Sequence, residues 1–179
     1  MKNLQDYLSE SILGDLGADL DKEATKFELE KIFTGDYKYR VYKDGSIGVT
    51  GNITLRDYDE DTIPQVVFRK IDGNLNIVDC PNIRNIIGLF DEKKGEITRT
   101  FSVTSCKSFD SLDGVPEKVR DVTLVDLPQL RTLDGMPKDV HRVQLLKLKK
   151  RWKEEDVRKY AKNAVEIMCS EEDKPAIVE

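Results

Sequence analysis

A short pattern of apolar residues recurs along the middle of the chain, and it restricts the possible fold more than any other feature. Three segments superimpose, residues 75–83, 101–109 and 122–130, each with apolar residues at relative positions 1, 3, 6 and 9. The register extends outward, so that the first apolar residues of five units are Ile53, Leu75, Phe101, Val122 and Val143. Subtraction gives steps of 22, 26, 21 and 21 residues. Repeats of roughly 20–29 residues are typical of solenoids in which each coil contributes a strand.

The alternation within each unit explains why a solenoid should form. Apolar-polar-apolar predicts a half-buried strand, because successive side chains point to opposite faces of a strand. One such strand does not bury its apolar face alone, so stacked coils pair their strands in parallel and share one core. Leu112-Asp113-Gly114 and Leu133-Asp134-Gly135 then predict turns, since glycine accepts positive φ. The segments that connect the strand of one coil to the strand of the next, which we call the return legs, are too short for full helices. We expect turns or 3₁₀ segments there.

The N-terminal segment predicts two helices and a hairpin. Helical spacing of apolar residues predicts an amphipathic helix over residues 2–16, and a second helix is expected from Lys22 to Phe33. These helices either cover the open N-terminal edge of the solenoid or, for the first of them, form a detachable docking element. Asp44-Gly45-Ser46 lies between two apolar runs, 37–42 and 47–49, which is typical of a β-hairpin.

The C-terminal segment predicts a second cap. Residues 153–160 have early acids and late bases, as suits a helix, and residues 164–168 are expected to form a last strand. The predicted fold class is therefore α/β: a short leucine-rich-repeat-like solenoid with a parallel β-sheet, N-terminal helices and a strand-helix-strand C-terminal cap. The predicted division is a helical leader or cap over 1–35, the solenoid with its C-terminal cap over 36–168, and a flexible acidic tail over 169–179.

Composition and charge narrow the function classes. The net charge of −5 argues against a general nucleic-acid binder, which needs a basic surface. No apolar run reaches the roughly 20 residues that span a membrane, and Asp6, Glu10 and Asp15 interrupt any candidate secretory signal. Three cysteines at irregular spacing favour free thiols in a reducing compartment. We therefore expect a protein that is not secreted by a signal peptide and has no membrane partner.

Several motifs resemble leucine-rich-repeat proteins encoded by tailed bacteriophages. The resemblance lies in residues 39–55 and 64–75, in the turn 111–116 and in Glu155-Asp156-Val157. The opening residues 4–13 are similar to a leader found on many proteins of gut bacteriophages. The family has no general activity to carry over. The resemblance implies a location in the bacterial host cytoplasm or the virion. This chain departs from the family in having fewer coils, and in placing Cys or Leu where Asn or Cys is usual.

Residues that could perform chemistry are sparse. His141 is the only histidine and is interpreted as a surface residue, since no second metal-ligand motif accompanies it. Cys80 and Cys106 share one repeat position and are expected to stack as small buried hydrophobes, with a disulfide as the alternative. The basic run 147–153 is either a charged cap edge or a contact for phosphate or an acidic partner. We expect no catalytic residue, metal or cofactor, and hence no enzyme.

The open face of the sheet is the predicted binding site. Polar side chains form one row across four coils, and a second row two residues further on is apolar in three of four. The candidate residues are Asn76, Val78, Ser102, Thr104, Thr123, Val125, Gln144 and Leu146, together with Leu4, Leu8 and Ile12 of the leader helix. An exposed apolar row is typical of a partner site, unless the leader helix folds over it.

The sequence therefore predicts a non-enzymatic protein-binding module of a bacteriophage that contacts a viral or host protein. The contact would be made through the sheet face or through the N-terminal helix. The alternative is a minor structural or virion component that self-assembles through that helix.

Overall fold

The computed structural model describes residues 29–92 and 94–170, which contain ten strands and little helix. Residues 29–32 are helical, and one short helix, α2, spans Glu154–Val157. The strands are β1 (Phe33–Thr34), β2 (Tyr37–Val41), β3 (Ile47–Gly51), β4 (Ile53–Arg56), β5 (Phe68–Asp72), β6 (Leu75–Val78), β7 (Glu96–Thr104), β8 (Lys118–Val125), β9 (Arg142–Leu146) and β10 (Glu166–Cys169). The described part of the chain is thus a β-solenoid, and its helical content is lower than the α/β class predicts.

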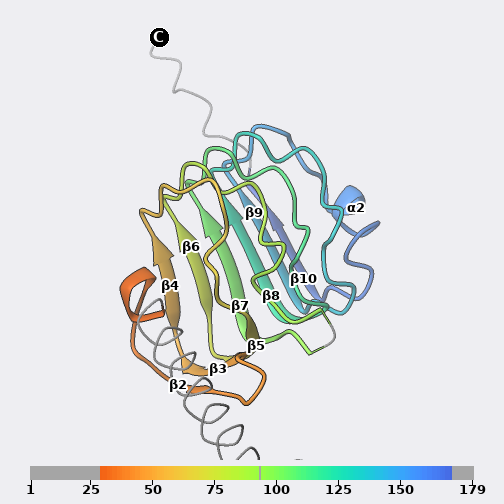
Figure 1. Cartoon of the computed structure of the whole chain (residues 1–179). Helices are drawn as coiled ribbons and strands as arrows, with labels where there is room; N and C mark the ends of the chain where they lie inside the picture. The colour runs from red at the N-terminus through yellow and green to blue at the C-terminus, as the bar shows by residue number, and fades with distance from the viewer. Residues whose placement is uncertain (1–28, 93, 171–179) are drawn as a thin grey trace, which may run out of the picture.

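Six strands run parallel and side by side in the order β4, β6, β7, β8, β9, β10 (Figure 1). Each predicted unit start pairs with the next, from Ile53 with Leu75 through Phe101 to Val122 with Val143. Ile167 of β10 then pairs with Val143, and the chain makes about six turns of a solenoid. The predicted repeat register is confirmed over all five units.

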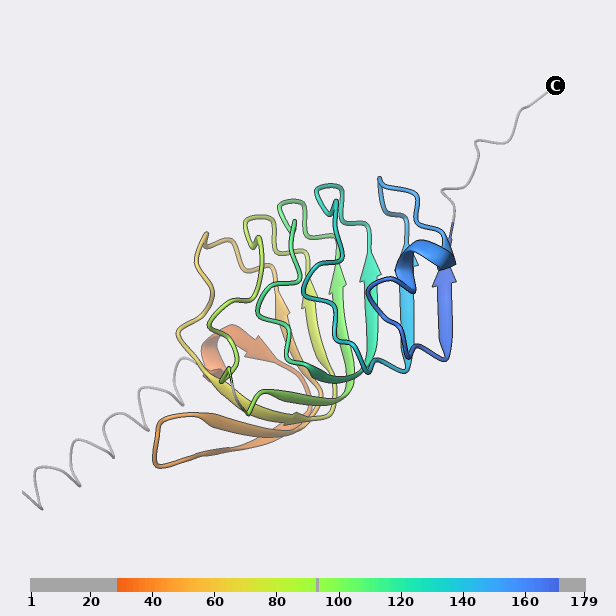
Figure 2. The ribbon, with the colours of Figure 1, turned by 90° about the vertical axis from the view of Figure 1, so that its right-hand side faces the viewer.

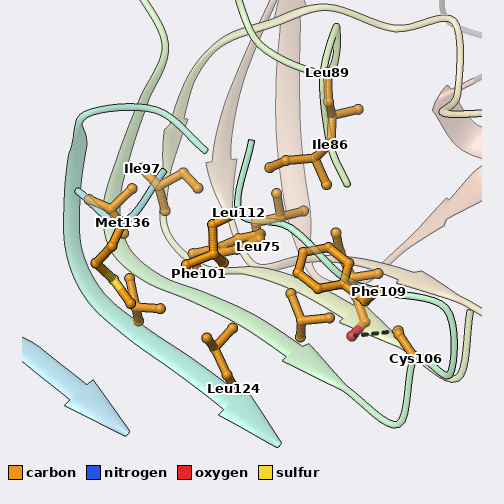
Figure 3. Packing of buried hydrophobic residues seen from close by; sticks show 14 of the residues in the cluster. Leu75, Ile86, Leu89, Ile97, Phe101, Cys106, Phe109, Leu112, Leu124 and Met136 are labelled. Atoms are coloured by element: carbon orange, nitrogen blue, oxygen red, sulfur yellow. Dashed lines mark hydrogen bonds between the residues drawn. The ribbon is translucent and has the colours of Figure 1, made fainter. Parts of the chain in front are cut away.

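The core lies inside the coils, where the first and third residues of each unit meet the return legs. Leu75, Phe101 and Leu124 are fully buried, and they pack with Phe109 and Leu112 from the return legs (Figure 3). Fully burying a side chain of this size stabilises the fold by roughly 1.5–3 kcal/mol. Because every coil adds several such residues, the solenoid needs no disulfide; all three cysteines are free.

The six parallel strands from β4 to β10 form the first flank of the solenoid. A second set of parallel strand pairs, which the sequence analysis did not predict, runs beside it, and we call this set the second flank. It pairs β3 with β5, and then β5 and β8 with the N-terminal part of β7. Its buried residues are Val49, Ile71, Ile97 and Val119, which repeat at steps of 22, 26 and 22 residues. The two flanks share one core, which explains why a chain with so little helix still buries a large apolar surface.

Close backbone contacts form the corner between the two flanks in the first coils. A Cβ on Gly73 would lie 1.9 Å from the carbonyl oxygen of Gly51, so only glycine fits there. The following asparagines link neighbouring coils: Asn52 Oδ1 accepts the Asn74 N–H at 3.3 Å, and Asn74 Oδ1 accepts the Thr100 N–H at 3.0 Å. The Gly-Asn pairs at 51–52 and 73–74 therefore have a structural role in stacking.

A left-handed residue ends the strand of each of five coils. These residues have φ between 52° and 55° and are Asp57, Asp79, Ser105, Asp126 and Lys147. Their positions repeat at the same steps as the unit starts, and Asp and Ser tolerate this conformation better than most residues. The backbone N–H of Asp79 donates to Thr104 O at 3.0 Å, and Ser105 donates to Val125 O in the same way. We call the left-handed residue and the four that follow it the rim of a coil.

The return legs contain turns, as predicted, and no 3₁₀ helix is present in residues 29–92 and 94–170. Val115 N–H donates to Leu112 O at 3.1 Å, and Met136 N–H donates to Leu133 O at 3.0 Å. Gly114 and Gly135 have φ of 89° and 84°, respectively, as the Leu-Asp-Gly motif predicts.

The N-terminal end of the solenoid is closed by strands. The hairpin β2–β3 is confirmed, with Gly45 at φ 76°, and it projects at this end of the solenoid (Figure 2). The predicted helix from Lys22 to Phe33 is corrected at its end, because Phe33 belongs to β1 and pairs antiparallel with Leu55. Phe33 is buried against Phe68, with ring centroids 5.4 Å apart, and this packing favours the strand. The predicted helix over 2–16, and residues 22–28 of the second predicted helix, lie outside the described residues.

The C-terminal cap is strand-helix-strand, but its helix is shorter than predicted. Only Glu154–Val157 is α-helical, and turns continue to Ala161, whose N–H donates to Val157 O at 2.9 Å. The last strand begins at Glu166, two residues later than predicted. Val157, Ala161 and Ala164 are buried, so the segment covers the end of the core before it returns to the sheet.

Gly88 and Gly114 have the same φ but different surroundings, so substitutions at these two positions separate backbone strain from steric overlap between stacked coils. Gly88 and Gly114 both have φ of 89°, but a Cβ on Gly114 would lie 2.5 Å from the Ile86 carbonyl carbon, whereas one on Gly88 meets nothing within 4 Å. We expect Gly88→Ala to lower the free energy of unfolding by about 1 kcal/mol, through backbone strain alone. Gly114→Ala should lower it by about 2–4 kcal/mol, since strain and overlap add. Chemical denaturation of both variants measures the difference, and equal losses would contradict it.

Candidate functional site

The open face of the sheet carries two rows of side chains that run across the coils. Both rows follow from strand geometry, since residues two apart along a strand share a face. The first row is Thr54, Asn76, Ser102, Thr123, Gln144 and Met168. The second row is Arg56, Val78, Thr104, Val125 and Leu146. The structure therefore brings together all eight candidate residues that the sequence analysis placed on this face.

Hydrogen bonds between neighbouring coils satisfy part of the first row. Asn76 Nδ2 donates to Thr54 Oγ1 at 3.3 Å, and Thr123 Oγ1 donates to Gln144 Oε1 at the same distance. Gln144 Nε2 lies 3.4 Å from the sulfur of Met168, which is 45% exposed. These contacts orient polar side chains along the row, so the row is an ordered surface.

The second row is mainly apolar and only partly shielded. Val78, Val125 and Leu146 are half-buried, and their branched side chains lie in one line because the strands pair without a register shift at these positions. Arg56 ends the line, where its guanidinium lies 3.2 Å from Asp79 Oδ2. A flat apolar line with a charge at one end has the form of a contact surface for another protein.

Three residues of this face lie outside the set that the sequence analysis named. Thr54 and Arg56 follow Ile53 at the same spacing as their equivalents in the next coils, so carrying the two rows into the unit that starts at Ile53 would have found them. Met168 lies in β10, whose register was not apparent because no full unit follows it. The candidate leader residues Leu4, Leu8 and Ile12 lie outside the described residues.

His141, which the sequence analysis considered for chemistry, lies at the surface beside Asp121. His141 is exposed, and its Nδ1 lies 3.8 Å from Asp121 Oδ1, too far for a direct hydrogen bond. Within residues 29–92 and 94–170, no three His, Cys, Asp or Glu side chains gather where they could hold a metal ion. A hollow of about 670 Å³ lies between rims, lined in part by Ser105, Lys107 and Asp126, and it is open to solvent. No helix in the described ranges is long and apolar enough to cross a membrane.

Cys80 and Cys106 stack inside the solenoid as free, buried thiols, in agreement with the predicted packing. Each donates to a carbonyl of the preceding coil, Cys80 to Leu55 O at 3.7 Å and Cys106 to Ile77 O at 3.9 Å. A hydrogen bond with the Cys80 thiol, followed by burial, raises the pKa of Cys106 well above its ordinary value. The same hydrogen bond lowers the pKa of Cys80, but both thiols are fully buried, so they link coils and are shielded from reagents in solvent.

Comparisons with known proteins identify no relative. No protein-family model matches the chain, and neither a curated protein nor a solved structure is significantly similar to it.

The thiols should differ in reactivity in a way that reports this packing. Burial, with a smaller effect of Glu154, raises the pKa of the half-buried Cys169, so it should react more slowly than a free cysteine with Ellman's reagent at pH 8. Cys80 and Cys106 should react only when denaturant unfolds the protein. A Cys169→Ser variant, which removes the first phase alone, serves as the control. Prompt reaction of all three thiols in the folded protein would contradict the packing.

Proposed function

We propose that this chain is a non-enzymatic protein-binding module that contacts a viral or host protein through the open face of its sheet. The observation that carries the proposal is the second row, in which Val78, Thr104, Val125 and Leu146 stand in register across four consecutive coils and three of the four are aliphatic. A parallel sheet holds such side chains at fixed spacing, so the partner meets a surface that needs little ordering on binding. Low ordering cost favours affinity, because less conformational entropy is lost.

The character of the face supports a protein partner over other classes. The two rows contain one positive residue, Arg56, and its charge is partly neutralised by Asp79. A nucleic-acid site needs several free bases to neutralise phosphates, so this face is poorly suited to nucleic acid. Its mixture of aliphatic side chains with Thr, Ser, Asn and Gln resembles the apolar centre and polar surround of protein interfaces.

The repeat pattern extends the proposal to a class of protein. The coils resemble those of leucine-rich-repeat proteins encoded by tailed bacteriophages, with Cys80 and Cys106 at the position that links neighbouring coils. On that resemblance we assign the chain to such a phage protein, acting in the bacterial host cytoplasm or in the virion.

Charge placed on the second row should abolish the interaction without unfolding the chain. We expect the variant Val125→Lys/Leu146→Lys to bind the partner at least about tenfold more weakly, because a desolvated lysine at an interface centre costs more than 1.4 kcal/mol. The measurement is affinity capture from phage-infected host cells, followed by titration of the captured protein against both chains. Ile87→Lys is the matched control, since Ile87 is 60% exposed on a return leg.

Circular dichroism and thermal melting of each variant separate a lost contact from a lost fold. A partner that binds the double variant and the wild type equally well would place the binding site elsewhere.

A further inference from the structure

A bulge in β5 turns two consecutive basic side chains to the outer side of the second flank. The register between β3 and β5 shifts after Phe68, so that Gly48 pairs with Lys70 and Arg69 is an extra residue. Phe68 and Ile71 on either side are fully buried, whereas both basic side chains are half-buried. Regular alternation would have sent one of them into the core. Bulges that redirect side chains in this way are frequent beside functional sites.

The redirected Arg69 reaches the ring of Tyr42, which a second guanidinium also approaches. The Cζ atoms of Arg69 and Arg40 each lie 4.6 Å from the centre of that ring. Arg40 Nε donates to Tyr42 Oη at 2.9 Å, and Arg40 Nη2 donates to the same oxygen. The phenol oxygen is therefore an acceptor, and within residues 29–92 and 94–170 its own proton has no acceptor. That proton is free to meet an anion.

A glycine inside β3 makes room for this arrangement. A Cβ on Gly48 would lie 3.0 Å from Tyr42 Oη and 3.4 Å from Arg40 Nε. The φ of Gly48 is not in the left-handed region, so its backbone does not require glycine. Glycine weakens the interior of a strand and often marks a place where another group approaches closely. The space above Gly48 is therefore used by Tyr42 and Arg40.

A hollow of about 420 Å³ lies beside these groups, where the hairpin β2–β3 meets β5. This is the end of the solenoid at which the hairpin projects (Figure 2). The hollow is lined in part by Lys38, Arg40, Tyr42, Gly48 and Lys70. We call this set, together with Arg69 against the Tyr42 ring, the basic hollow.

Three of the four cations of the basic hollow have no carboxylate partner. Within residues 29–92 and 94–170, ion pairs are absent from Lys38, Arg40 and Arg69. Lys70 has one, with Glu96 at 3.5 Å. Two guanidiniums held against one ring repel each other, and an anion beside them would remove that repulsion. This local excess of positive charge occurs in a chain whose net charge is −5.

The carboxylates near the basic hollow already have partners. Asp72 Oδ1 accepts the Thr98 hydroxyl at 2.9 Å. Two hydrogen bonds from Ser46, with a smaller effect of Arg69, hold the pKa of Asp44 below its ordinary value. The hydrogen bonds hold each carboxylate to its own neighbour, so the unpaired cations face an anion from outside this part of the chain.

We propose that the basic hollow binds a phosphate group, either free or as the monoester of a small molecule. Arginine forks match phosphate oxygens and form charge-assisted hydrogen bonds with them. Arg40 has N–H groups left after its two bonds to Tyr42, while Lys38 and the Tyr42 hydroxyl add donors to the same hollow. A dianion neutralises these unpaired cations better than a single carboxylate does. The site lies on the second flank, so it is independent of the protein contact proposed for the sheet face.

The size and borders of the basic hollow favour a small ligand over a nucleic acid. Its volume lies in the range of small-molecule pockets, roughly 300–1,000 Å³. Asp72 and Glu96 border it on the side of β5 and β7, so the positive surface does not continue along the flank. A nucleic-acid backbone needs a longer basic track.

The test is a titration of the full chain followed by ¹H–¹⁵N NMR, which reports the backbone amides and the arginine Nε–H groups. The probes are inorganic phosphate and glycerol 3-phosphate, with acetate as the singly charged comparison, all at low ionic strength. We expect both phosphates to cause saturable shifts at Arg40 Nε–H and at the Gly48 amide. Tighter binding of the ester would show that the rest of the hollow takes part, and equal binding would assign free phosphate.

Substitutions separate the basic hollow from general attraction of anions. We expect Arg40→Gln to weaken phosphate binding at least about tenfold, the scale of lost charge-assisted hydrogen bonds. Tyr42→Phe keeps the ring, removes the hydroxyl and should weaken it about threefold. Lys43→Gln removes the same charge from an exposed residue of the same hairpin and should change it by less than about twofold. Circular dichroism shows that each variant is folded.

Four results would overturn the proposal. The first is the absence of a saturable shift at Arg40 Nε–H with either phosphate. Equal weakening by Arg40→Gln and Lys43→Gln would reduce the effect to net charge. Acetate that binds as tightly as phosphate would assign the basic hollow to a carboxylate. A short DNA duplex that shifts the same signals at a tenfold lower concentration than phosphate would assign it to nucleic acid.

Discussion

Parallel pairing between strands that lie 21–26 residues apart is the interaction on which the rest of this structure depends. A single coil has an apolar side that faces inward and nothing to cover it except the next coil and its own return leg. The register must be constant, because a slip of one residue would turn every inner side chain outward. The left-handed residue at each strand end serves this constancy, since it repeats with the same steps as the strands. The close glycine contacts do so in two pairs, Gly51 with Gly73 and Gly114 with Gly135, which are 22 and 21 residues apart.

The same register determines which side chains remain for function. Positions one and three of each unit are committed to the core, so positions two and four are the ones left on the sheet face. The left-handed residue and the four that follow it form the rim, which is strongly charged in the first and fifth coils. A solenoid therefore separates two kinds of surface, an ordered flat face with aliphatic character and a charged margin, without any need for a pocket.

Much of the fold could be predicted from the sequence because the repeated pattern of apolar residues is regular. The register of the units from Ile53 to Val143, the hairpin around Gly45 and the turns at Gly114 and Gly135 follow from local pattern and turn chemistry, and the structure agrees with each. The second flank was missed although Val49, Ile71, Ile97 and Val119 repeat at nearly the same steps. Their flanking residues are irregular, so the pattern is visible only when the first repeat is already known.

Other features depend on tertiary packing that a sequence pattern does not contain. Phe33 follows helical residues but becomes a strand residue, because it pairs with Leu55 and fills the space against Phe68. The C-terminal helix is cut to one turn because the chain must return to pair β10 with β9. The acidic run 57–61 and the basic run 147–151 are seen to occupy equivalent positions only when both are placed on their coils.

The range of the strand pairing has a consequence for how the chain reaches this structure. Every parallel contact along the first flank closes a loop of one coil, and even the longest step, 26 residues between Leu75 and Phe101, is short on the scale of the chain. Loop-closure entropy rises only slowly with length, so each added coil meets nearly the same entropic barrier as the last. Folding is then expected to start from one pair of neighbouring coils and to spread outward, with the 26-residue step from Leu75 to Phe101 as the slowest single addition.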